Sequence, residues 1–143
     1  MNEAELEKIK IKALEEHIPI IMDDTLNVVG NLLGKIKPNA ILEIGTAVGY
    51  SAICFSKYLL DGGIIDTIER EHDRVEEAKR NIKLVDIADK INIIEGDAVE
   101  ILPTINKKYD AIFIDAAKGK YPFFLSEALR LINKNGYIIA DNV

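Results

Sequence analysis

Apolar residues recur along the chain at two different spacings. Near the amino terminus, Leu6, Ile9 and Ala13 recur every three or four residues, which predicts a helix over residues 3–16. After Pro38, short continuous apolar runs alternate with helical patterns. The runs predict strands at residues 40–44, 64–68, 91–94, 111–114 and 137–140. The remaining helical patterns cover residues 25–36, 50–60, 73–85, 99–102 and 121–132.

Strands that alternate with helices indicate an α/β fold, and continuous apolar runs indicate strands that are buried on both faces. The pattern predicts a doubly wound parallel sheet with helices on both faces and with the first and fourth strands side by side. We expect a single domain over residues 1–143, with amino-terminal helices in residues 1–38 and the sheet in residues 39–143. Ligands of such sheets bind beyond the carboxyl ends of the strands.

The composition agrees with one globular domain, because 143 residues with 48% hydrophobic and 29% charged residues can bury a core. The chain has no run of eighteen apolar residues and begins with a charged amphipathic stretch, so we expect a cytoplasmic protein with no membrane partner. The single cysteine, Cys54, excludes an intramolecular disulfide and lies in an apolar run, which favours packing. A net charge of −6 disfavours non-specific binding to nucleic acid but leaves room for a local basic patch.

The first strand ends in a turn with two glycines, Gly45 and Gly49. Glycine lets the backbone turn sharply and approach a ligand that a side chain would exclude. Ala47 and Tyr50 stand where a dinucleotide fingerprint needs its second and third glycines, and no phosphate-binding Gly-Lys-Ser/Thr sequence occurs. This spacing argues against an NAD-dependent oxidoreductase.

Two further strand ends carry carboxylates. Glu69 ends the second strand, at the position from which a carboxylate can accept hydrogen bonds from both hydroxyls of a ribose. Asp97 and Ala98 follow the third strand where an adenine ring would lie, although Asp97 is also a plausible helix cap. Each feature alone could be an ordinary turn or a solvated charge. Together, at successive strand ends, they indicate an adenosine ligand without phosphates.

The sequence EIGTAVGYS from Glu43 to Ser51 is followed by Glu69, Gly96-Asp97-Ala98, Asp115-Ala-Ala-Lys118 and Asp141-Asn142. These motifs resemble those of the metal-dependent O-methyltransferase family, which includes catechol and caffeoyl-CoA methyltransferases. Within the family, the segment beginning at His17 is similar to the bacterial branch that includes the tRNA 5-hydroxyuridine methyltransferase. The resemblance implies a Rossmann-like class I methyltransferase whose last strands are missing from this chain.

The resemblance also implies roles for single residues. S-adenosylmethionine would lie across the turn that contains Gly45, Thr46 and Gly49. Glu43 would lie near its amino acid portion, and Ser51 near its carboxylate. Glu69 would bind the ribose, and Asp97 and Ala98 would lie near the adenine, with Asp115 also at the cofactor. Lys118 is the family's candidate general base, with Asp115 beside it in the catalytic group; this role requires a lowered lysine pKa, and a solvated loop lysine is the alternative.

Asp115, Asp141 and Asn142 follow the fourth and fifth predicted strands, so three oxygen ligands could converge there. Oxygen ligands favour a hard cation such as Mg²⁺, which would keep positions open for water and for two substrate oxygens. Aspartates also close strands as turn residues or caps. A consecutive Asp-Asn at the end of a buried strand favours the metal interpretation.

Two methyl acceptors have the required pair of neighbouring oxygens: a catechol-like small molecule and 5-hydroxyuridine in a tRNA anticodon loop. Lys8, Lys12, Lys35 and Lys37 could form a basic rim for RNA, although an ordinary solvated surface is the alternative. A non-catalytic adenosine-binding or regulatory domain, or an inactive fragment, is a further possibility. Because family members continue past the Asp-Asn pair, we expect an exposed edge at the fifth strand and a homodimer.

Overall fold

The structure is a computed structural model that describes residues 2–115 and 119–141. Its helices are α1 (Glu3–Glu15), α2 (Asp23–Ile36), α3 (Tyr50–Ser56), α4 (His72–Leu84), α5 (Ala98–Ile101), the 3₁₀ helix η1 (Leu102–Thr104) and α6 (Tyr121–Leu131). Its strands are β1 (Ala40–Ile44), β2 (Ile64–Glu69), β3 (Ile91–Glu95), β4 (Tyr109–Asp115) and β5 (Ile132–Asp141). Among the described helices, α2 is the longest at 14 residues, and none combines the length and apolarity needed to cross a membrane.

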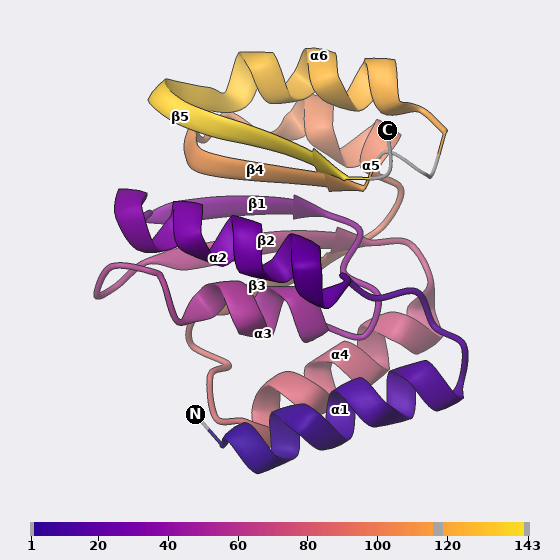
Figure 1. The fold of residues 1–143 in the computed structure, drawn as a ribbon. Helices are drawn as coiled ribbons and strands as arrows, with labels where there is room; N and C mark the ends of the chain where they lie inside the picture. Colours follow the sequence, from indigo (N-terminus) through magenta and orange to yellow (C-terminus); the bar gives the residue numbers. More distant parts are fainter. Residues whose placement is uncertain (1, 116–118, 142–143) are drawn as a thin grey trace.

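The strands form one parallel sheet in the order β3-β2-β1-β4-β5 within the described residues. The predicted pairing of the first and fourth strands is confirmed, since Ile41 pairs with Ala111 and Ile44 with Ile114. Figure 1 shows the arrowheads of β1, β4 and β5 at the same edge of the sheet. The carboxyl ends of neighbouring strands therefore meet along that edge, as the predicted doubly wound α/β fold requires.

Both faces of the sheet are covered, which explains why the strands are continuously apolar. One face packs against α1, α2, α3 and α4, where Leu6, Val29 and Ile41 belong to one buried cluster. The opposite face packs against η1 and α6, where Leu42 lies with buried residues of those helices. Ile41 and Leu42 are neighbours in sequence but enter different clusters, because successive side chains of a strand point to opposite faces.

Cys54 lies inside the first cluster and is 2% exposed. Burial raises the pKa of its thiol to about 11, which keeps it protonated and unreactive at neutral pH. The prediction that this cysteine packs in the core is confirmed.

Two predicted boundaries are wrong by four residues or more. The helix after the glycine turn ends at Ser56, not Leu60, because the chain then turns and the Leu60 amide donates to the Pro38 carbonyl at 3.0 Å. The last strand begins at Ile132, before the predicted start at Tyr137, because Ile132 pairs with Tyr109. The pairing of β4 with β5 shifts register between Tyr109 and Ala111. Contacts between residues far apart in sequence therefore decide both boundaries, and a local sequence pattern carries no information about such contacts.

Candidate functional site

The glycine turn follows directly from the end of β1. Gly45 has a φ of 106°, a backbone conformation that residues with a Cβ rarely adopt. The amides of Gly45 and Thr46 donate to the Ile68 carbonyl at 2.9 and 3.1 Å, which ties the turn to β2. A Cβ built on Gly45 would lie 4.0 Å from the Cβ of Asp115, so the turn passes beside the end of β4.

Gly49 lies away from the end of β4 that Gly45 approaches. It caps the start of α3 with a φ of 88°, and a Cβ at this position would lie 3.4 Å from the Cβ of Ala78 on α4. Gly49 is not among the residues that line the two cavities described below. The structure therefore brings Gly45 to the site and uses Gly49 to start the helix behind it.

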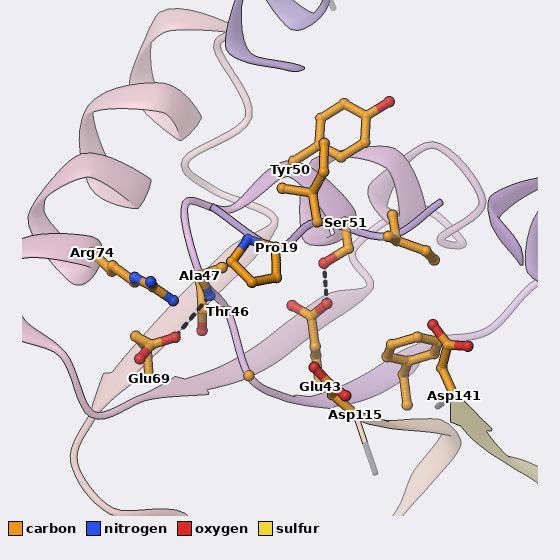
Figure 2. A pocket seen from close by; sticks show the side chains of 14 residues that line it. Pro19, Glu43, Thr46, Ala47, Tyr50, Ser51, Glu69, Arg74, Asp115 and Asp141 are labelled. Atoms are coloured by element: carbon orange, nitrogen blue, oxygen red, sulfur yellow. Dashed lines mark hydrogen bonds between the residues drawn. The ribbon is translucent and has the colours of Figure 1, made fainter. Parts of the chain in front are cut away.

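The first cavity lies at the carboxyl edge of the sheet, beside the glycine turn (Figure 2). It brings together residues from β1, the turn, α3, α4 and the ends of β2, β4 and β5. Four of its lining side chains are carboxylates, and one, Arg74, is a cation. Of the predicted site residues, those lining it are Glu43, Gly45, Thr46, Ser51, Glu69, Asp115 and Asp141.

Glu43 is a carboxyl group inside the protein, only 1% exposed. Ser51 donates a short hydrogen bond to it, and Thr67 donates another at 2.7 Å. Thr67 is in turn 2.6 Å from the Thr46 hydroxyl. Burial raises the pKa of Glu43 to about 7, against the two hydrogen bonds, which lower it. Glu43 therefore changes charge near neutral pH, and the protein holds its side chain in one orientation.

Glu69 accepts hydrogen bonds from three backbone amides. Ala47 donates to one carboxylate oxygen at 2.8 Å, and Arg70 and Glu71 each donate to the other at 3.1 Å. These bonds hold the Glu69 carboxylate at the glycine turn. A carboxylate has about four acceptor positions, so about one remains for a ligand.

A second cavity shares Gly45, Glu69 and Arg74 with the first and extends toward the end of β3. Asp97 and Ala98 line it, so the structure places both predicted residues beside Glu69. Asp97 also caps α5, because its side chain accepts from the Val99 amide at 2.9 Å. The two cavities together run along the carboxyl ends of the five described strands, from β3 to β5.

Asp115 and Asp141 are paired residues of β4 and β5, and both line the first cavity. Their carboxylate oxygens suit a hard divalent cation. Lys118 and Asn142, the predicted base and third ligand, lie outside the described residues. Within residues 2–115 and 119–141, no three His, Cys, Asp or Glu side chains form a metal-binding group, and the predicted set contributes only two such side chains.

Sequence reasoning missed three parts of this site. Thr67 lies two residues before Glu69 on the same face of β2, a signal that strand alternation does contain. Arg74 lines both cavities, and only the packing of α4 beside the turn reveals it. The segment 19–21 closes the first cavity from the amino-terminal region, far away in sequence.

Comparison with known proteins agrees with this geometry. Residues 3–143 match the family described as O-methyltransferase. The catechol O-methyltransferase of Mycobacterium tuberculosis is 33% identical over 113 residues, covering 78% of this chain and 51% of that protein. The structure of a candidate caffeoyl-CoA O-methyltransferase from Staphylococcus aureus has a TM-score of 0.89 and 35% identity, covering 96% of this chain and 66% of its own. An O-methyltransferase from Bacillus cereus in complex with SAH has a TM-score of 0.89 and 28% identity, covering 99% and 67%.

The chain therefore belongs to the O-methyltransferase family, and its sheet is the Rossmann-like sheet of these methyltransferases. The predicted resemblance to catechol and caffeoyl-CoA methyltransferases is confirmed. The chain spans about half the length of curated relatives such as the Mycobacterium protein.

The described residues fit an S-adenosyl ligand. Gly45 has a positive φ beside the cavity, Glu69 keeps about one acceptor position, and four acidic side chains line the first cavity, which favours a cationic ligand. Among the described residues, Asp115 and Asp141 would supply two oxygen ligands to a divalent cation from the paired ends of β4 and β5.

Proposed function

We propose that this chain is the donor-binding core of an S-adenosylmethionine-dependent, divalent-cation-dependent O-methyltransferase. The observation that carries the proposal is that one cavity contains both the glycine turn at Gly45 and the paired strand-end carboxylates Asp115 and Asp141. A methyl donor bound along the turn and an acceptor oxygen bound at the carboxylates would therefore be neighbours. Holding two reactants in this way removes much of the entropic barrier to their reaction.

Separate residues of the chain would bind the donor, hold the cation and accept a proton. Glu69 binds the ribose of the donor, Asp97 and Ala98 border the adenine, and Glu43 with Ser51 borders the amino acid portion. Asp115, Asp141 and Asn142 would hold the cation, which would supply Lewis-acid chemistry by lowering the pKa of an acceptor hydroxyl. Lys118 would accept the proton of the acceptor hydroxyl, which requires a lysine pKa lowered by the neighbouring charge.

We propose a small molecule with two neighbouring oxygens, such as a catechol, as the methyl acceptor. The Mycobacterium relative is named for that activity. The contacts of the predicted basic rim also favour a small molecule over RNA. The two lysines of this rim on α1 form ion pairs with acidic side chains. Lys8 pairs with Glu5 at 3.4 Å, and Lys12 pairs with Glu77 at 3.0 Å. These contacts weaken the attraction of this surface for the RNA backbone.

Transfer of a radiolabelled methyl group from S-adenosylmethionine tests the proposal. The acceptors are catechol and tRNA containing 5-hydroxyuridine, each with Mg²⁺ and with EDTA. We expect labelled catechol only when Mg²⁺ is present. Label in tRNA alone would reassign the acceptor, and equal rates in EDTA would exclude the metal mechanism. Binding of S-adenosylhomocysteine without transfer to either acceptor would instead support a non-catalytic adenosine-binding domain or an inactive fragment.

We also propose a cytoplasmic homodimer. In the described sheet, β5 pairs with β4 on one side and forms an edge, and exposed edges favour association with another chain. Sedimentation equilibrium tests this point, and a single monomeric species across the concentration range would contradict it.

A further inference from the structure

A side-chain contact joins the two chain segments that form the second cavity. One wall of this cavity comes from residues 69–74, which lead from β2 into α4, and another comes from residues 96–99, which follow β3. The Nδ1 atom of His72 lies 3.1 and 3.0 Å from the two carboxylate oxygens of Glu95. Neither side chain lines a cavity, so the pair connects the two walls from outside the ligand space.

Regular structure holds both members of this pair in place. His72 is the first residue of α4, and Glu95 is the last residue of β3. Glu95 is the register partner of Glu69, and the Gly96 amide donates to the Glu69 carbonyl at 2.8 Å. Exposed ion pairs usually contribute little, because ordering two side chains costs entropy. Here both backbones are already fixed and one imidazole nitrogen contacts both oxygens, so the cost of ordering is smaller.

The charge of His72 decides how strong the contact is. A carboxylate can only accept, so Nδ1 donates, and the bond is stronger when the imidazole is protonated. The hydrogen bond and the charge of Glu95 raise the pKa of His72 above its ordinary 6.5, and the charges of Glu76 and Asp73 add to this rise. The dipole of α4 opposes it. The charged contact is therefore complete below pH 6.5 and is lost as the pH rises through the raised pKa.

The other charged groups of the two walls have partners of their own. Glu71 lies 3.9 Å from Arg70. Glu69 accepts from three backbone amides, and Asp97 caps α5. These contacts leave Glu95 as the closest carboxylate partner of the imidazole.

The helices that pack beside α4 do not change this assignment. Further along α4, Glu77 pairs with Lys12 of α1 at 3.0 Å. The titratable side chains of α3 are Tyr50 and Cys54, and burial raises the pKa of both, so they stay neutral over the range in which histidine titrates. The charge of His72 therefore acts mainly on Glu95 and on the acidic residues of its own helix.

A donor bound in the second cavity contacts both walls, so its affinity depends on how often the walls hold the spacing that the bound state needs. We propose that His72 is a positioning residue for the methyl donor: its contact with Glu95 holds the two walls in the binding arrangement, and loss of its proton makes donor affinity decrease as the pH rises. The inference rests on the proposed function, because it assumes an S-adenosyl ligand in this cavity.

Isothermal titration calorimetry with S-adenosylhomocysteine from about pH 6 to about pH 9 tests the inference without requiring turnover. We expect His72→Ala to weaken binding about threefold at the acidic end and by a smaller factor at the alkaline end. Other groups that titrate in this range, Glu43 included, affect both proteins and cancel in the ratio of their dissociation constants. Glu95→Gln should give the same dependence, and the double variant should bind no more weakly than either single variant.

The pKa of His72 gives a second measurement, followed through the NMR chemical shift of its imidazole. Because the protonated form favours the binding arrangement, S-adenosylhomocysteine should raise this pKa. Two variants serve as controls. His72→Asn keeps an uncharged donor near the position of Nδ1 and should bind like the wild-type protein at the alkaline end. His17→Ala removes the other histidine of the sequence and should follow the wild-type affinity at every pH.

Three results would overturn the inference and leave the proposed function intact. They are a ratio of dissociation constants that does not vary with pH, a pKa of His72 that the ligand does not change, and a lower free energy of unfolding in His72→Ala without any change in affinity. The third result would show that the pair stabilises the fold without acting on the cavity. Failure of the wild-type protein to bind S-adenosylhomocysteine would overturn both proposals.

Discussion

Asp115 and Asp141 are register partners at the ends of neighbouring parallel strands, and both side chains line the cavity beside the glycine turn. This pairing predicts a shared cation. Asp141→Asn should weaken Mn²⁺ binding at least about tenfold, because it removes one charged ligand from a site that has few. Electron paramagnetic resonance of free Mn²⁺ measures the change. Asp89→Asn, an exposed aspartate before β3, is the matched control, and equal affinities in both variants would exclude Asp141 as a ligand.

Glu43 makes the stability of the protein depend on pH near neutrality. Its pKa is about 7 in the folded protein against an ordinary 4.5, first because of burial and further because of the charges of Glu69 and Asp115. The folded protein therefore keeps a proton that the unfolded chain releases as the pH rises from 4.5 to 7. The free energy of unfolding therefore decreases over that window, by on the order of 3 kcal/mol in all, because ionisation of this carboxyl stabilises the unfolded chain.

Glu43→Gln should remove this dependence. Between pH 5 and pH 7.5, urea unfolding of the wild-type protein should show a free energy of unfolding that decreases relative to that of the variant. The substitution also changes the hydrogen bonds of Glu43. This change affects the free energy of unfolding at both pH values and therefore cancels in the comparison. Glu100→Gln, at an exposed position, should leave the wild-type slope unchanged. Parallel pH profiles for the wild-type protein and Glu43→Gln would contradict the raised pKa.

Substitutions at two glycines with positive φ should separate the effect on ligand binding from the effect on stability. Gly45→Ala should destabilise the protein by about 1–2 kcal/mol, because alanine resists a φ of 106°. It should also weaken binding of S-adenosylhomocysteine, because its methyl group enters the turn beside the cavity. Gly62→Ala is the matched control, because Gly62 has a comparable φ of 80° and nothing lies within 4 Å of a Cβ added there.

Thermal unfolding and calorimetry on the two glycine variants make the comparison. We expect similar losses of stability but a loss of ligand affinity only in Gly45→Ala. Normal affinity in Gly45→Ala would show that the ligand does not approach this turn.

A polar cluster around the buried Asp66 carboxylate, at the other end of the sheet, should support stability but not ligand binding. Tyr109 donates to the Asp66 carboxylate at 2.7 Å, and Lys107 and Asn92 complete its partners at 3.1 Å each. Tyr109→Phe should lower the free energy of unfolding by about 1–3 kcal/mol, because a buried carboxylate loses a donor.

Ligand affinity should not change in Tyr109→Phe, since Tyr109 begins β4 and the cavities lie at its carboxyl end. Tyr137→Phe is the control, because that side chain is 46% exposed. Urea unfolding and calorimetry measure both quantities, and an unchanged free energy of unfolding in Tyr109→Phe would contradict the role of the cluster.

The strand order and much of the candidate site could be predicted from the sequence. Apolar runs and helical spacing are local properties, and right-handed crossovers then place the first strand beside the fourth. Because the carboxyl ends of parallel strands share an edge, Gly45, Glu69, Asp97, Asp115 and Asp141 could be assigned to one cleft before any coordinates. All five line one or both of the two joined cavities.

The sequence by itself determined the parallel α/β architecture, the family and the residues at the strand ends, because these depend on local periodicity and on topology. Only the tertiary structure decided which side chains contact one another across the turns. The Thr67 hydrogen bond to Glu43 and the Ala47 hydrogen bond to Glu69 join residues 24 and 22 positions apart. The approach of Arg74 to the cavity depends on how α4 packs. Such contacts depend on distances of a few ångströms between separate elements, and no local pattern specifies those distances.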